Sequence, residues 1–126
     1  MKKKSTNKRL FLIAGYSAQK IVDTGLIYML QAMSEHGDTV LVMDSDVPQS
    51  ELNKISKYVL HASAKKHGEY DFGSYKRAYT YARDTGILSN YDFVYLINDS
   101  VYGPLYPIDS YLKKMESFNT DAFGLV

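Results

Sequence analysis

The chain of 126 residues is long enough for one domain with a hydrophobic core. It contains no cysteine, which excludes disulfides, a thiolate metal site and a cysteine nucleophile. Residues 1–9 hold five basic and no acidic side chains, so residues 10–126 carry 10 basic and 14 acidic ones. This acidic balance argues against nucleic acid as a partner.

The first nine residues predict a basic, flexible leader, and residues 10–126 predict one α/β domain. The positive charge of the leader also suits peripheral contact with an anionic membrane surface. The apolar run 10–14 is too short for a signal peptide, and no segment approaches the roughly 20 apolar residues that span a bilayer. We therefore expect a cytoplasmic protein, with contact at the inner face of the membrane as an option.

Apolar runs typical of buried strands occupy residues 10–14, 39–43, 92–97 and 121–126. Residues 58–62 could begin a further strand or continue a short helix that starts at Pro48. Between these runs, apolar residues recur at helical spacing. The expected helix signals are Asp23 or Thr24 as a start and Gly37 as an end, Ser74 as a cap and Gly86 as an end, and Asp109 as a cap of a last helix. Residues 65–73 predict a polar loop, and the helix after Ser74 is expected to place Tyr75, Ala78, Tyr79 and Ala82 on one face.

The alternation of strands and helices predicts right-handed βαβ units. The fold class is therefore α/β, a three-layer sandwich with a mostly parallel sheet. A flavodoxin-like or receiver-like domain fits the same alternation. A receiver, however, needs an acidic cluster after its first strand, where this chain has Gly15, Tyr16 and Ser17.

Asp99 is the strongest candidate for a functional residue, because it directly follows the predicted strand 92–97. Ligands of open α/β sheets bind beyond the carboxyl ends of the strands. A carboxylate there, flanked by Asn98 and Ser100, can bind Mg²⁺, Mn²⁺ or a sugar hydroxyl. The alternative is a turn-forming aspartate that bonds only to backbone.

Asp44 and Asp46 follow the second predicted strand, and Tyr16 and Ser17 follow the first. An acidic side chain at such a position can accept hydrogen bonds from a base or a ribose. The alternative for Asp44 and Asp46 is helix capping and turn formation ahead of Pro48. The convergence of these loops on one sheet edge predicts a binding site there.

Residues 69–77 join a loop to a helix start, where backbone N–H groups favour phosphate. Lys76 and Arg77 can add positive charge, although both can equally be solvated. The segment lacks the glycine spacing of a Walker loop. The three histidines, His36, His61 and His67, show no metal-ligand spacing, and no serine sits in a G-x-S-x-G elbow. The 12 tyrosines suit carbohydrate stacking, although most are expected at the core boundary.

Two segments, YDFGSYK at residues 70–76 and LINDSVYGPLYP at residues 96–107, resemble the rhamnan synthesis protein F family. The segment DAFGL at residues 121–125 resembles the next strand of that family. The resemblance implies a glycosyltransferase of bacterial surface polysaccharide synthesis, including lipopolysaccharide O-antigen. It implies a GT-A type, Rossmann-like nucleotide-diphospho-sugar transferase fold, of which this chain supplies the amino-terminal half.

The resemblance also implies roles for individual residues. Asp44 or Asp46 would contact the nucleotide base, while Asp71, Lys76 and Arg77 would border the diphosphate and the sugar. The element Asn98, Asp99 and Ser100 takes the place of a DxD motif, so only Asp99 remains as a carboxylate for Mg²⁺ or Mn²⁺. The implied donor contacts are Tyr16, Ser17, Asp44, Asp46, Asp71, Lys76, Arg77, Asn98, Ser100 and Tyr102. The loop at residues 65–69 lacks the asparagine-glycine pattern expected of the family.

Members of this family continue beyond the segment that resembles residues 121–126, and the catalytic base of a GT-A enzyme usually lies in that continuation. The resemblance therefore implies a rhamnosyltransferase-like donor-binding domain with no assignable base, acting on a glycan or lipid-linked glycan acceptor. The alternative is a catalytically inert remnant or nucleotide-binding module. An apolar last strand without a neighbour would favour a homodimer that covers it.

Overall fold

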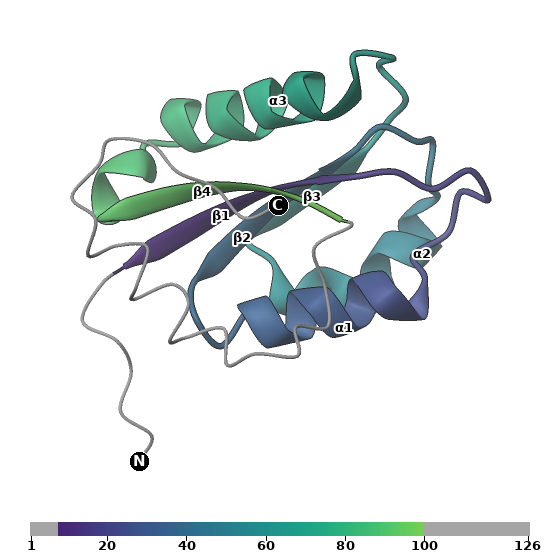
Figure 1. Cartoon of the computed structure of the whole chain (residues 1–126), viewed down its shortest axis with the longest axis horizontal. Helices are drawn as coiled ribbons and strands as arrows, with labels where there is room; N and C mark the ends of the chain where they lie inside the picture. The colour runs from purple at the N-terminus through teal and green to yellow at the C-terminus, as the bar shows by residue number, and fades with distance from the viewer. Residues whose placement is uncertain (1–7, 100–126) are drawn as a thin grey trace.

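The computed structural model describes residues 8–99, which form a four-stranded, all-parallel sheet in the order β3-β2-β1-β4 (Figure 1). The strands are β1 (Arg9–Gly15), β2 (Asp38–Met43), β3 (His61–Ala64) and β4 (Phe93–Asn98). The helices are α1 (Thr24–Met33), α2 (Gln49–Leu52) and α3 (Tyr70–Asp84), with 3-10 turns at Asn53–Tyr58 and Leu88–Asn90.

Helices cover both faces of the sheet: α1 and α2 lie on one side and α3 on the other (Figure 1). This arrangement confirms the predicted three-layer α/β architecture. The chain adds β2 and β3 on one side of β1 and then crosses to place β4 on the other side. This reversal creates a topological switch point between β1 and β4, the position at which open α/β sheets bind ligands.

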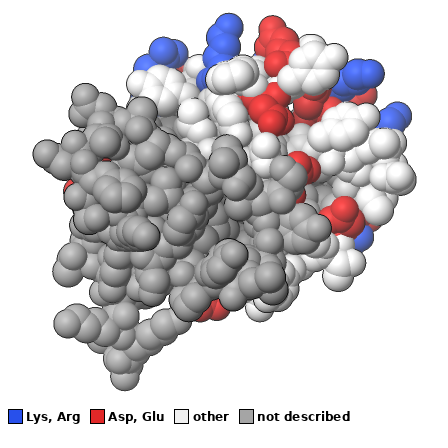
Figure 2. Space-filling model, viewed as in Figure 1, with Lys and Arg blue, Asp and Glu red and all other residues white. Residues whose placement is uncertain are grey.

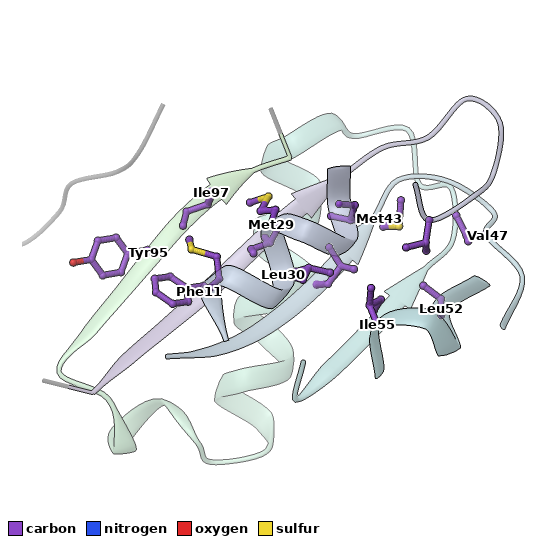
Figure 3. Packing of buried hydrophobic residues seen from close by; sticks show 14 residues of the cluster. Phe11, Met29, Leu30, Met43, Val47, Leu52, Ile55, Tyr95 and Ile97 are labelled. Carbon is purple, nitrogen blue, oxygen red and sulfur yellow. The ribbon is translucent and has the colours of Figure 1, made fainter. Parts of the chain in front are cut away.

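Successive side chains of a strand point to opposite faces of the sheet. Because the strands contain continuous apolar runs, both faces of the sheet are apolar. Phe11 and Ile13 of β1 belong to the larger core cluster, which includes Met29 and Leu30 of α1 together with Ile55 (Figure 3). The alternate residues of β1 and β2 pack against Ala78 and Ala82 of α3. Every residue of β1 is buried, which explains the continuous apolar run from Leu10 to Ala14.

The element boundaries differ from expectation at several points. The strand β1 begins at Arg9, one residue before the predicted domain start, and the Arg9 side chain is buried with its guanidinium donating to the His36 carbonyl. Residues 58–62 were compatible with a strand or a helix; in the structure a 3-10 turn ends at Tyr58 and β3 begins at His61. Asp23 caps α1 by accepting the Leu26 N–H at 2.9 Å, but α1 ends at Met33, before Gly37.

The prediction that Ser74 caps a helix after a polar loop at 65–73 was wrong. The helix α3 begins at Tyr70, and Ser74 is a buried residue in its second turn. Tyr79, expected on the same face as the buried Ala78 and Ala82, is 48% exposed. Gly86 does end α3 as predicted, and its φ of +76° shows why glycine suits that position.

Ser100, Tyr102, the helix predicted from Asp109 and the strand predicted over residues 121–126 lie outside the described residues. The predicted dimer that would cover this strand falls there too. Within residues 8–99, no helix is long and apolar enough to cross a membrane.

Candidate functional site

The site candidates of β1 and β4 meet at the switch point. The backbone N–H of Tyr16, which follows β1, donates to Asp99 Oδ2 at 2.9 Å. The backbone N–H of Asp99 in turn donates to the Ala14 carbonyl at 3.0 Å. A Cβ added to Gly15 would lie 3.7 Å from Asp99 Oδ2, so the carboxylate sits directly over the end of β1. We call the carboxyl ends of the strands and the loops that follow them the rim.

Asp71 joins this group from the first turn of α3. Its Oδ2 accepts from Asn98 Nδ2 at 3.4 Å, which links α3 to the end of β4. Residue 71, far in sequence from 98 and 99, is therefore their neighbour on the rim. The contacts among these residues follow from the strand order, which places β4 beside β1.

The charge of Asp99 is held in an unfavourable environment. Burial above all, together with the negative charge of Asp71, raises the pKa of Asp99 despite the hydrogen bond from Tyr16. Burial and the charges of Asp71 and Asp99 also raise the pKa of Tyr75 to about 12. The local potential is thus negative, and a cation or a hydroxyl donor is favoured there.

Asp44 fixes the loop between β3 and α3. Its Oδ1 accepts the backbone N–H groups of His67 at 2.7 Å and Gly68 at 2.9 Å. The hydrogen bond from Gly68 above all, with that from His67, holds the pKa of Asp44 below its usual value although the side chain is buried. Asp46 acts in the same way on the Lys66 N–H, at 2.9 Å from Oδ1. Both residues thus bond to the loop before α3, and neither caps the helix after Pro48, which has no side-chain cap.

His67 is the residue at the site that sequence reasoning missed. The Glu69 N–H donates to His67 Nδ1 at 3.0 Å, so Nδ1 carries no proton and Nε2–H donates to Ser74 Oγ at 2.9 Å. No motif spacing marks this histidine, because its partners come from the start of α3 and from the end of β2. The one available signal was a histidine in a short loop between a strand and a helix.

Asp44, His67 and Ser74 follow one another as in a hydrolase triad, but their geometry does not support nucleophilic catalysis. The distance of 3.6 Å from Asp44 Oδ1 to His67 Nδ1 is too long for a hydrogen bond, and Nδ1 already accepts the Glu69 N–H. Ser74 is buried in α3 and out of reach of a substrate. The network has a structural role, because its hydrogen bonds join the loop at 66–69 to α3.

Lys76 and Arg77 lie beside a hollow of about 300 Å³ whose described lining also includes Glu69 and Thr80. The Arg77 guanidinium forms an ion pair with Glu69 and donates to the Gly73 carbonyl at 3.1 Å. Within residues 69–77, whose N–H groups were expected to favour phosphate, Glu69 donates its N–H to the His67 ring. The preceding N–H groups of His67 and Gly68 are occupied by Asp44. Neither basic side chain is hydrogen-bonded to the Asp71 and Asn98 pair in the described interactions.

Ser17 connects the end of β1 to the end of β2. Its backbone N–H donates to Ser45 Oγ at 2.8 Å, and its own Oγ accepts the Ile21 N–H at 3.2 Å. Tyr16 and Ser17 therefore lie between Asp99 on one side and Ser45 on the other. The rim is continuous from β4 across β1 to β2.

The acids at the switch point fit a divalent cation only in part. Among the described residues, no group of three or more histidines, aspartates or glutamates is arranged to hold a metal ion. Asp99 and Asp71 can supply one or two carboxylates, which is the number that Mg²⁺ uses when phosphates and water complete its shell. A metal at this site would therefore depend on a phosphate-bearing ligand.

Fold and rim together define a Rossmann-like α/β half domain with a polar site at its topological switch point. The model of one family, rhamnan synthesis protein F, matches residues 39–126, well over half of the chain. The chain belongs to this family, and its general role is in polysaccharide synthesis. No curated protein and no solved structure matches the chain.

Proposed function

We propose that this chain binds a nucleotide-diphospho-sugar at its rim and serves as the donor-binding part of a GT-A type glycosyltransferase. The process would be rhamnosyl transfer in the synthesis of a bacterial surface polysaccharide or lipopolysaccharide O-antigen. The observation that carries the proposal is the meeting of Tyr16, Asp99, Asn98 and Asp71 at the switch point of a family member's sheet.

Within this proposal, Asp99 and Asp71 face the sugar hydroxyls or a cation beside the diphosphate. Asn98 orients Asp71 through their hydrogen bond, and the Tyr16 N–H orients Asp99. Asp44 and Asp46 would contribute to base recognition mainly by shaping the loop at 65–68. Ser17 borders the nucleotide, and Ser100 and Tyr102 remain donor contacts implied by the resemblance alone.

Lys76 and Arg77 take a different place in the proposal from the one expected. Because Arg77 is paired with Glu69, its charge is partly neutralised. In the proposal, Lys76 and Arg77 therefore lie at the edge of the site. A divalent cation, when bound, would neutralise charge that develops on the departing diphosphate. The general base for the acceptor hydroxyl is not assigned to any described residue.

Residues 10–126 are proposed to act as one nucleotide-sugar-binding unit, with residues 1–9 as a basic leader able to contact an anionic membrane. The proposed acceptor is a glycan or a lipid-linked glycan. An inert nucleotide-binding module would share the donor site and transfer no sugar. Donor hydrolysis or transfer to an acceptor, measured after binding is established, separates these two functions.

A thermal-shift screen against dTDP-, UDP- and GDP-sugars, with and without Mn²⁺, tests the proposal. A ligand at one hundred times its Kd stabilises the folded protein by about 2.7 kcal/mol, which is readily measured. We expect one nucleotide class to raise the melting temperature, with a larger effect when Mn²⁺ is present. No shift with any sugar nucleotide would contradict the proposed function.

A further inference from the structure

Two large aromatic side chains at the start of α3 are almost fully exposed to solvent. Tyr70 is 82% exposed and Phe72 is 83% exposed. A third ring, Tyr16, is 62% exposed and lies at the end of β1, on the same rim. Exposed aromatic side chains that gather at one place commonly mark a binding surface.

The rings adjoin the acids of the switch point. The Phe72 ring meets the Tyr75 ring edge-on, with centroids 6.2 Å apart and planes at 86°. Tyr75 in turn lies in the field of Asp71 and Asp99. Figure 2 shows acidic side chains among uncharged ones toward the right of the view, where Figure 1 places the carboxyl ends of the strands. Aromatic faces and hydrogen-bond acceptors therefore lie next to one another.

The backbone holds these rings in place. Tyr70 has a φ of +60°, a left-handed conformation that a tyrosine rarely adopts. The neighbouring loop is fixed by Asp44 and His67, and buried Gly73 leaves no room for a side chain beside Glu69 and His67. A strained conformation persists when its surroundings enforce it, and such positions cluster at binding sites.

We propose that Tyr70 and Phe72 bind pyranose rings of a glycan chain, the acceptor side of the reaction, and this inference rests on the proposed function. The apolar face of a pyranose stacks on an aromatic ring, and its hydroxyls donate to carboxylates such as Asp71. The negative potential disfavours a polyanionic glycan chain. Several exposed rings along one rim suit a chain of sugars better than the single sugar of a donor.

Titration calorimetry with a rhamnose tetrasaccharide and a sulfated tetrasaccharide tests this inference on the full chain. Phe72→Ala removes one ring, and Tyr70→Asn removes the other while keeping a residue that tolerates positive φ. Tyr28→Ala is the matched control, because Tyr28 is 59% exposed on α1, in the opposite layer. We expect each rim variant to weaken the neutral tetrasaccharide about tenfold.

The control variant should bind like the wild type, and the sulfated probe should bind more weakly than the neutral one. Absence of wild-type binding, unchanged affinity in both rim variants, or tighter binding of the sulfated probe would overturn the inference. A change in oligomeric state in place of a change in glycan affinity would also overturn it, since the rings would then cover a second copy. Donor-induced thermal shifts, measured separately on Phe72→Ala, should persist, and their absence in the wild type would count against the proposed function alone.

Discussion

Asp44 follows β2 and Asp99 follows β4, the two strands on either side of β1, yet the protein has opposite effects on their pKa values. Asp44 accepts two backbone N–H groups, and its pKa is lowered. Asp99 accepts the Tyr16 N–H, is half-buried and lies in the field of Asp71, and its pKa is raised. The first charge stabilises the fold, whereas the second lowers its stability at neutral pH.

This contrast predicts opposite effects of the same substitution. At neutral pH, Asp44→Asn should lower the free energy of unfolding by about 1–3 kcal/mol, because it weakens charged hydrogen bonds. Asp99→Asn should leave the free energy of unfolding unchanged or raise it, because the amide oxygen still accepts the Tyr16 N–H and the half-buried charge is gone. Urea unfolding of both variants and the wild type measures these differences.

The pH dependence follows from the direction of each pKa shift. The stabilisation by Asp44 is present above the ordinary aspartate pKa of about 3.9 and fades as pH falls through its lowered folded pKa. The penalty from Asp99 grows as pH rises from that ordinary value through its raised folded pKa. Both differences in the free energy of unfolding between variant and wild type should therefore shrink toward acidic pH. Changes of the same sign in both variants at neutral pH would contradict the opposite effects assigned to the two charges.

The start of α3 is the element on which sequence and structure differ most. Helix spacing predicts the body of α3 and its end at Gly86, but it places the cap at Ser74 instead of the true start at Tyr70. The true start depends on Asp44 and His67, whose bonds to loop N–H groups span distances in sequence that local patterns do not encode. The sequence favours Ser74 as a cap because local patterns do not indicate its hydrogen bond with His67 inside the protein.

A pair of glycine substitutions tests how tightly this start is built. An alanine at Gly73 would place its Cβ against the Glu69 side chain and 3.0 Å from His67 Cε1, so Gly73→Ala should lower the free energy of unfolding by about 1–3 kcal/mol. At Gly25, in α1, the nearest atom is Asp23 Oδ1 at 3.5 Å, so Gly25→Ala should raise it by about 0.5 kcal/mol. Chemical denaturation compares the two, and equal stabilisation by both alanines would show that the α3 start is loosely packed.

At the scale of the whole molecule, the sheet could be predicted because each buried strand is a continuous apolar run. The runs that became β1, β2 and β4 were located to within a residue or two, and the parallel three-layer arrangement followed from their alternation with helices. The short strand β3 stayed ambiguous, since all of its four residues are only half-buried and its sequence is mixed. Which rim residues touch was not predictable, because strand order decides it.

Strand order also determines where the proposed site lies. Because β4 lies next to β1 on the side opposite to β2, Asp99 and Asn98 meet Tyr16 at the switch point and not at a remote edge. The family match and this geometry are independent observations, and both support the proposed donor site at the rim. The glycan surface at Tyr70 and Phe72 would extend the same site outward along α3.

The most direct test of donor binding at the switch point is a calorimetric titration with the sugar nucleotide that gives the largest thermal shift. Wild type, Asp99→Asn and Asp84→Asn should be compared, since Asp84 is an exposed acid at the far end of α3, paired with Arg83. We predict saturable binding to the wild type and Asp84→Asn, and at least tenfold weaker binding to Asp99→Asn without loss of stability. Equal affinity of all three proteins would contradict the placement of the donor at the switch point.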